Sequence, residues 1–479
     1  MCNDVVRSPA TGLGPSLRRA LLSESPRPER IRAHPLAPWL VVATVSIGAF
    51  MGQLDASIVT LALPHIGVAF HASPAVVVWV SLSYLLVLVA TLPAAGFLAD
   101  RFGRKLLYIQ GFVVFTAASL ACGLAPDLGA LVLARCVQGV GAALLQANSV
   151  ALIREALSGD RLGRGLGVQG AAQAVGLAGG PAIGGLLLAL GGWRLLFFVN
   201  IPAGVLGALA GIVLLPRSRS HRRGVRFDWR GAVLLAVAAG ALMVVVSLGR
   251  EPGFTPPLIT GLGILAVAAA AGFVVLERRV AAPLLDLPLL ARRPLGPALA
   301  SGLVAQMVLF GTLIAVPFDL AARGVGSAVA GLELAALPAA LGLVAPVAGR
   351  FADRFGRRLL APAGLALCGL GLVALAFAHA APERIAALAV AGAGLGAFVP
   401  SNNTTIMRAA PPGRAGAMSG VLNMTRAMGT ALGVALASLL YASAGGADHR
   451  LAVTLVALGA VAVASAAALA ASVHLREPR

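Results

Sequence analysis

The feature that most constrains this chain is a succession of fourteen apolar segments along its 479 residues. A helix needs about 20 apolar residues to cross the hydrocarbon core of a bilayer. The segments have about that length, and alanine, leucine and valine run through them without the alternation typical of a strand. They lie near residues 39–63, 75–98, 106–124, 128–150, 163–190, 195–215, 231–249, 257–276, 295–318, 326–348, 359–379, 385–407, 416–441 and 451–472. The sequence therefore predicts an all-α integral membrane protein with 14 transmembrane helices.

Composition favours the same class of protein. Hydrophobic residues make up 59% of the chain and charged residues 11%, whereas soluble domains carry about 45–50% and about 25%. A net charge of +19 would indicate nucleic-acid binding in a soluble chain, but these arginines lie in short stretches between apolar segments. We expect a lipid bilayer and a small-molecule substrate as partners, and no nucleic acid.

The four cysteines form no close pair, so we expect neither a disulfide framework nor a metal site.

The distribution of positive charge predicts the orientation of the chain. With the N-terminus in the cytoplasm, the cytoplasmic stretches collect 30 of the 37 Lys and Arg residues and the outer loops collect 5. The other two, Arg135 and Arg426, fall inside apolar segments. Positive residues concentrate on the cytoplasmic side of membrane proteins. We therefore expect a multi-pass protein of the cytoplasmic (inner) membrane with both termini in the cytoplasm.

A twelve-residue stretch at 96–107 returns at 349–360, with nine identical positions. The offset is eight apolar segments, two more than a direct repeat of six-helix halves would give. The repeat predicts a cytoplasmic tail (1–38), an N-terminal six-helix half (39–215), a basic loop with two inserted helices (216–294), a C-terminal six-helix half (295–472) and a C-terminal tail (473–479). Repeated halves around a central site are typical of transporters.

Both copies of the repeated stretch are predicted cytoplasmic turns. Their glycines allow a tight reversal, and Asp100 and Asp353 are placed to cap a helix. A plain positively charged loop would explain the arginines but not the repeated spacing of Gly and Asp. The residues we expect to form a cytoplasmic gate are Gly96, Asp100, Arg101, Gly103, Arg104, Asp353, Arg354 and Arg357.

The stretch from Gly96 to Lys105 resembles the signature loop of the major facilitator superfamily. Four more stretches resemble motifs of its fourteen-helix drug:proton antiporter group, at 54–64, 135–141, 176–185 and 193–204. The first of these departs from the usual pattern, which has Thr at position 57 and Asn at position 60. The resemblance covers residues 39 to about 470. It implies the major facilitator fold, export of small molecules driven by proton influx, and a link between Arg135 and proton coupling. The residues that match its antiport helix are Gly176, Gly180, Pro181, Gly184 and Gly185.

Charges inside the bilayer are costly and indicate function. Asp55 lies deep in the first segment, where burial favours its protonated form and a nearby arginine favours its ionised form. We expect Asp55 and Arg135 to couple transport to protons, although a structural ion pair of Asp55 with Arg135 or Arg426 would also explain the charge. Glu333, in the tenth segment, is compatible with a second protonation site, a cation-binding carboxylate or a partner for Arg426.

Polar residues also recur on single faces of the predicted helices. Steps of three and four residues place Arg135, Gln138, Gln146 and Ser149 on one face of the fourth segment. Such a face points into a cavity or onto the polar groups of another helix. The residues we expect to line a substrate cavity are Gln53, Gln138, Gln146, Gln169, Gln173, Asn402, Asn423 and Arg426. Hydrogen bonds between helices would explain the same amides.

These observations predict a proton-coupled exporter of small amphipathic molecules such as drugs or antibiotics. A transporter of the same fold dedicated to one metabolite, and a membrane sensor that moves nothing, are the two alternatives. The sequence lacks the nucleotide-binding motif GxxxxGK[ST] and any supported catalytic triad. We therefore expect no enzyme activity, no cofactor and a monomer driven by the proton gradient, with the two inserted helices at its periphery.

Overall fold

The computed structural model describes residues 24, 27–157, 160–218, 228–249, 254–280, 287–290, 294–355, 357–409, 415–443 and 447–474. Within these ranges every regular element is a helix, and fourteen helical segments are long and apolar enough to cross a membrane. The prediction of an all-α protein with fourteen spans is confirmed. The segments are α3 (Ala37–Ala69), α4 (Pro74–Val77) with α5 (Trp79–Phe102), α6 (Arg104–Gly123), α7 (Leu128–Ala156), α8 (Asp160–Gly191), α9 (Leu195–Phe198) with α10 (Asn200–Leu214), α11 (Trp229–Leu248), α12 (Pro256–Glu277), α14 (Leu295–Ala322), α15 (Ser327–Phe355), α16 (Arg357–Ala376), α17 (Ala381–Ala409), α18 (Ala415–Ser443) and α19 (Ala447–His474). Two short helices, α2 (Glu29–Arg32) and α13 (Leu287–Leu290), lie outside them.

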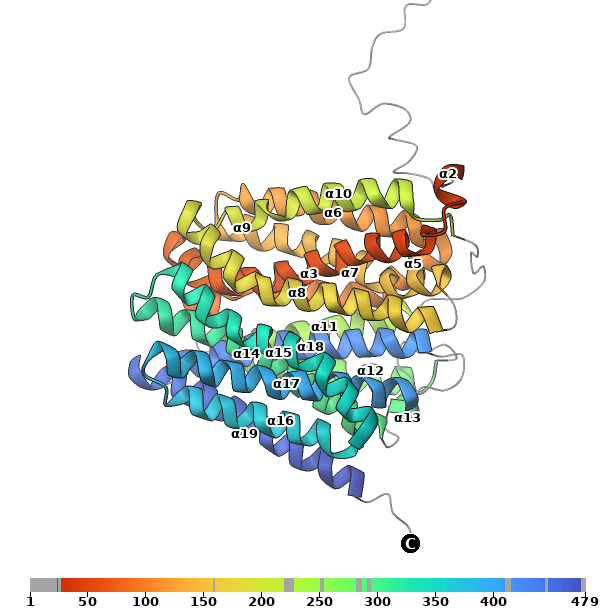
Figure 1. Ribbon diagram of the computed structural model, residues 1–479. Coiled ribbons are helices and arrows are strands. Elements are labelled where there is room, and N and C mark those ends of the chain that lie inside the picture. Colours follow the sequence, from red (N-terminus) through yellow and green to blue (C-terminus); the bar gives the residue numbers. More distant parts are fainter. Residues whose placement is uncertain are drawn as a thin grey trace, which may run out of the picture.

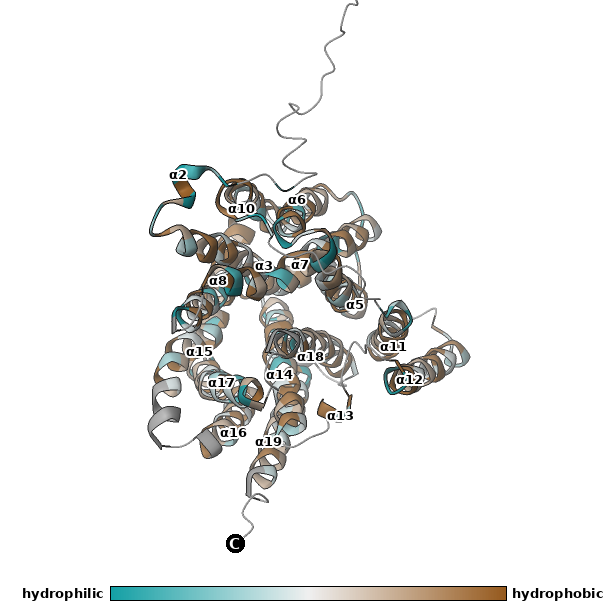
Figure 2. Cartoon of the chain, turned by 90° about the vertical axis from the view of Figure 1, so that its right-hand side faces the viewer, coloured by the Kyte–Doolittle hydropathy of each residue, from teal (hydrophilic) through white to brown (hydrophobic). Residues whose placement is uncertain are grey.

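The long helices run side by side (Figure 1), and a view along them separates two groups of helices (Figure 2). One group holds α3, α5, α6, α7, α8 and α10, and the other holds α14 to α19. The first residue of α3 and the last of α19 lie at the same end of the bundle, called here the terminal end.

The two groups are built by the same helix pairing. In the first group α3 packs on α8, α5 and α6 both pack on α7, and α10 packs on α6. In the second group α14 packs on α18, α15 and α16 both pack on α17, and α19 packs on α16. The groups then meet through two equivalent contacts, α8 with α15 and α5 with α18. The repeat in the sequence thus corresponds to a repeat in the packing.

The two inserted helices lie beside this arrangement. Helix α11 packs against α5 and α18, and α12 packs mainly on α11 (Figure 2). The Trp79 indole Nε1 donates a hydrogen bond of 3.1 Å to the Ser247 hydroxyl and so ties α5 to α11. The most apolar stretch of α12 is only 17% buried, which indicates that lipid covers most of that helix.

Candidate functional site

Asp55 and Arg135 form a buried ion pair between α3 and α7. The Arg135 Nη1 atom lies 2.6 Å from the Asp55 Oδ2 atom, and the two side chains are 1% and 0% exposed. The sequence predicted both residues as intramembrane charges, and the structure brings them together. Because each charge neutralises the other, neither is left unpaired in the apolar interior.

Two amides complete the shell of hydrogen bonds around the Asp55 carboxylate. Gln138 Nε2 and Asn200 Nδ2 donate to the Asp55 Oδ1 atom at 3.0 Å and 2.8 Å. Gln138 also donates to the Ser119 hydroxyl and accepts a hydrogen bond of 2.6 Å from Arg135. The carboxylate from α3 is therefore held by side chains from α7 and α10, and α6 supports one of them. We call Asp55, Arg135, Gln138 and Asn200 the carboxylate network.

Arg135 links this network to α5. Its Nε atom donates to the Val80 carbonyl at 2.8 Å, and its guanidinium carbon lies 4.3 Å from the centre of the Tyr84 ring. An arginine over an aromatic ring is stabilised by the negative face of the π system. Tyr84 also lines the cavity described next, so one ring separates the ion pair from the cavity.

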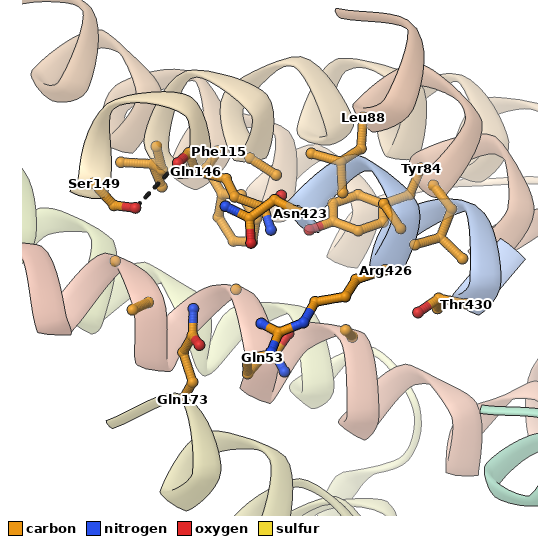
Figure 3. A pocket seen from close by; sticks show the side chains of 18 of the residues that line it. Gln53, Tyr84, Leu88, Phe115, Gln146, Ser149, Gln173, Asn423, Arg426 and Thr430 are labelled. Atoms are coloured by element: carbon orange, nitrogen blue, oxygen red, sulfur yellow. Dashed lines mark hydrogen bonds between the residues drawn. The ribbon is translucent and has the colours of Figure 1, made fainter. Parts of the chain in front are cut away.

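A cavity lies between the two groups of helices (Figure 3). It contains about 870 Å³ of space that no protein atom fills, part of it open to the outside. Its wall comes from α3, α5, α6, α7 and α8 of the first group and from α14 and α18 of the second. On α7 and α8 the lining residues fall between the middle of the helix and the terminal end.

Six of the eight predicted cavity residues lie in this wall. They are Gln53, Gln146, Gln169, Gln173, Asn423 and Arg426. The predicted polar face of α7 is continuous, with Arg135 and Gln138 in the carboxylate network and with Gln146 and Ser149 at the cavity.

Two predicted cavity residues lie elsewhere. Gln138 is turned toward Asp55 and fully buried in the carboxylate network. Asn402 donates to the Ala298 carbonyl at 2.9 Å, so its polar group joins α17 to α14. For Asn402 the alternative of a hydrogen bond between helices is correct.

Glu333 is paired, but not with Arg426. Its two carboxylate oxygens accept hydrogen bonds of 2.9 Å from the Nε and Nη2 atoms of Arg384. Arg384 lies in the first turn of α17 and is 7% exposed. Glu333 is near the start of α15 and does not line the cavity. The pairing with Arg426 is therefore wrong, because α17 supplies a nearer arginine.

The glycines of α8 allow close contact with two other helices. A Cβ atom at Gly176 would lie 2.5 Å from the Phe50 carbonyl oxygen, and Gly180 and Gly184 pack against Ser57 and Ile58 of the same helix, α3. Gly185 faces the opposite group of helices and meets Gly331 of α15. Only residues without a side chain allow backbones to approach in this way. The contact between Gly185 and Gly331 closes the two groups against each other on the side away from the terminal end.

Pro181 takes part in the same contact. It lies inside α8, and its carbonyl oxygen occupies the space that a Cβ atom of Gly331 would need. The α8–α15 crossing therefore joins two predicted antiport residues, Pro181 and Gly185, to a glycine that the sequence analysis did not single out.

The first predicted gate turn is partly as expected. Gly103 has φ = 112°, a left-handed conformation that glycine adopts readily, and it separates α5 from α6. Asp100 does not cap a helix, because it lies in the last turn of α5 and pairs with Arg104 at 2.7 Å. Arg104 also pairs at 2.5 Å with Glu155, at the end of α7.

Of the remaining gate residues, Arg101 is exposed and Gly96 lies within α5 with no atom near its Cβ position. The side chains of Asp353, Arg354 and Arg357 lie outside the described part of the structure.

The sequence analysis missed several residues of the site. Tyr84, Phe115, Gln306, Phe310 and Thr430 line the cavity, and Asn200 holds Asp55. Asn200 belongs to a stretch that was noted as a motif, but the sequence showed no partner for it. The aromatic residues resemble any other apolar residue of a membrane helix, so nothing in the sequence distinguishes them.

Comparison with protein families finds one described as the Major Facilitator Superfamily, which matches residues 45–313 and 298–479. The chain is 33% identical to the uncharacterized transporter YebQ of Escherichia coli over 91% of this chain and 96% of the relative. It is 34% identical to the multidrug resistance protein Stp of Mycobacterium tuberculosis, over 83% and 74%. It is 30% identical to the riboflavin transporter RibZ of Clostridioides difficile, over 84% and 88%.

Among solved structures, the crystal structure of a POT family transporter in complex with 5-aminolevulinic acid is similar to this chain. The two superimpose with a TM-score of 0.66 at 14% identity, over 89% of this chain and 94% of the other. The likeness extends to the arrangement of the helices.

Proposed function

Because this chain belongs to the Major Facilitator Superfamily and is a multi-pass membrane transporter, we propose that it exports small amphipathic molecules in exchange for protons. The observation that carries the proposal is the buried carboxylate network beside a cavity formed by both groups of helices. A carboxylate that can gain and lose a proton within the bilayer is the group that proton coupling requires.

The contacts around Asp55 link its protonation state to the cavity wall. Protonation of Asp55 removes its negative charge, and Arg135 then loses the partner that neutralises it. Arg135 lies over Tyr84, which is in the cavity wall, and Gln53 and Ala56 on either side of Asp55 line the same cavity. A change of charge at Asp55 therefore acts directly on the walls that contact a substrate.

Alternating access follows from the two helix groups. In the described structure α8 and α15 are closed against each other away from the terminal end, and the cavity lies toward the terminal end. Rocking one group against the other about the α8–α15 and α5–α18 contacts would open the opposite side. If the terminal end is cytoplasmic, this conformation takes up substrate from the cytoplasm.

The relatives support drug export as the first candidate and single-metabolite transport as the second. Stp is named as a multidrug resistance protein, whereas RibZ is named as a riboflavin transporter. The breadth of the substrate profile decides between the two, because a dedicated transporter would respond to one compound of a chemically varied panel.

The first experiment is substrate-induced proton release from inside-out vesicles, followed with a pH-sensitive dye. We expect several compounds to trigger release with the wild type and none with Asp55→Asn, because an amide cannot carry a proton through the cycle. Asp127→Asn is the matched control, since Asp127 only caps α7 through the Ala130 amide. Proton release retained in Asp55→Asn would contradict the assignment of Asp55.

We further propose that the terminal end faces the cytoplasm of a bacterial inner membrane, that the protein works as a monomer and that it uses no cofactor. The excess of arginine in the stretches at that end supports the orientation. Alkaline phosphatase, which is active only outside the cytoplasm, should be inactive when fused after Arg479 and active when inserted after Gly324. The reverse pattern would overturn the orientation.

A further inference from the structure

Arg426 is a charged residue without a partner in the cavity wall. It lies on α18 within the candidate span Gly420–Ser443, and its side chain points from α18 into the cavity (Figure 3). No described residue forms a hydrogen bond or an ion pair with it, and the described residues of the cavity wall include neither Asp nor Glu.

Other intramembrane charges of the described helices are neutralised by protein groups. Arg135 is paired with Asp55, and Arg384 with Glu333. A guanidinium in an apolar setting is costly unless something neutralises it. Arg426 instead faces the cavity, where a bound anion can neutralise it.

Asp55 does not supply that group. Its carboxylate already accepts hydrogen bonds from Arg135, Gln138 and Asn200 and is fully buried. The remaining polar wall is neutral, and its amides are Gln53, Gln146, Gln169, Gln173, Gln306 and Asn423. The cavity thus has a fixed positive charge at one point and neutral donors and acceptors around it.

The apolar wall suits a flat hydrophobic body. Tyr84, Leu85, Leu88, Phe115 and Phe310 line the cavity and come from three helices of the two groups. Aromatic walls bind ring systems by stacking and by edge contacts. A guanidinium binds carboxylate, sulfonate or phosphate oxygens with two parallel hydrogen bonds.

We propose that this transporter binds amphipathic organic anions, with the anionic group on Arg426 and an aromatic body against Tyr84, Phe115 and Phe310. The inference rests on the proposed function, in that it names the substrate class of the same cavity. Cationic amphipathic compounds are excluded from the site, because Arg426 is the only charged group among the described wall residues, and it repels cations.

The test compares two probes that share a ring body and carry permanent opposite charges, 2-naphthalenesulfonate and (2-naphthyl)trimethylammonium. Binding to the purified full chain is measured by equilibrium dialysis, and transport is measured in proteoliposomes with an imposed proton gradient. We expect the sulfonate to bind at least about tenfold more tightly than the cation. Arg426→Gln should weaken sulfonate binding by about 10- to 100-fold, the range for a hydrogen-bonded charge.

Two further variants keep the result interpretable. Arg426→Lys retains a positive charge but not the two parallel hydrogen bonds, so it should keep the preference for the anion at reduced affinity. Arg408→Gln removes an exposed arginine from the last turn of α17, outside the cavity, and should bind like the wild type.

The binding data decide the inference, and the transport data decide the proposed function. Preference for the cation, binding of neither probe, or sulfonate binding unchanged in both Arg426 variants would overturn the inference. Sulfonate binding that depends on Arg426, without proton-driven transport of any compound, would support the inference on the cavity and contradict proton-coupled export. Proton-driven transport of the cation without sulfonate binding would support proton-coupled export and contradict the inference on the cavity.

Discussion

At the scale of single residues, a substitution of Asn200 tests proton coupling without changing a residue of the substrate cavity. Its amide donates to Asp55 and does not line the cavity. We expect Asn200→Ala to lower the maximal transport rate about tenfold, because a hydrogen bond to a charged group contributes about 1.5–3 kcal/mol. The KM for substrate should stay unchanged, because no group that contacts substrate is altered. Initial rates in proteoliposomes over a range of substrate concentrations measure both quantities.

The matched control for Asn200 is Asn148→Ala. Asn148 is also a buried asparagine, but its amide donates only to the Leu144 carbonyl of its own helix. That variant should transport at close to the wild-type rate. An equal loss of rate in both variants would mean that Asn200 acts only through packing.

The ion pair between Glu333 and Arg384 predicts a structural role for Glu333, which a substitution can test. Glu333→Gln leaves the buried Arg384 charge without its partner, which typically costs about 3–5 kcal/mol in a buried pair. We expect a lower unfolding temperature and intact proton release on addition of substrate. Glu383→Gln alters an exposed carboxylate nearby and should change neither. Loss of proton release in a Glu333→Gln protein of normal stability would make Glu333 a coupling residue.

At the scale of helices, the α8–α15 crossing is where the structure closes on the side away from the terminal end. A Cβ atom at position 331 would lie 2.9 Å from the Gly185 Cα atom and would collide with the Pro181 carbonyl. Gly331→Ala must therefore push the two helices apart, at a cost of about 1–3 kcal/mol for overpacking. We expect slower transport and a lower unfolding temperature.

Gly326→Ala is the control for this prediction. It makes the same change five residues earlier, where no atom lies within 4 Å of the Cβ position. If Gly331→Ala transports as fast as Gly326→Ala, the prediction is wrong. Transport would then not require the close contact between α8 and α15.

The polar face of α7 shows how far helix periodicity reaches. A spacing of three and four residues predicts that Arg135, Gln138, Gln146 and Ser149 share a face, and they do. The periodicity does not predict which groups this face contacts at each position along the helix. Near Arg135 it meets Asp55 on α3, and about two to four turns further along the helix it meets the cavity.

At the scale of the whole molecule, α11 and α12 lie outside the repeated packing of the two six-helix groups. They contribute no residue to the described cavity wall, and α12 packs mainly on α11. We expect a protein in which residues 229–280 are replaced by a flexible linker to keep its orientation and to retain transport at a reduced level. Removal of two spans leaves every other helix crossing the membrane in its original direction.

The control removes only residues 254–280, which contain α12. An odd number of spans would invert α14 to α19 relative to the membrane, so this protein should not transport. Proteoliposome transport and the unfolding temperature are measured for both proteins. A stable twelve-helix protein without transport would show that α11, which packs against α5 and α18, takes part in the cycle.

The sequence by itself determined the number of crossings, the repeat and the shared polar face of α7. These features are local, because the thickness of the bilayer sets the length of each apolar segment and the helical turn sets the face. Only the tertiary structure decided which charges meet. The sequence allowed Arg135 or Arg426 as partner for Asp55, and Arg426 as partner for Glu333, because it contains no measure of how helices rotate and pack against each other. Packing joins Asp55 to Arg135 and Glu333 to Arg384, and it leaves Arg426 facing the cavity.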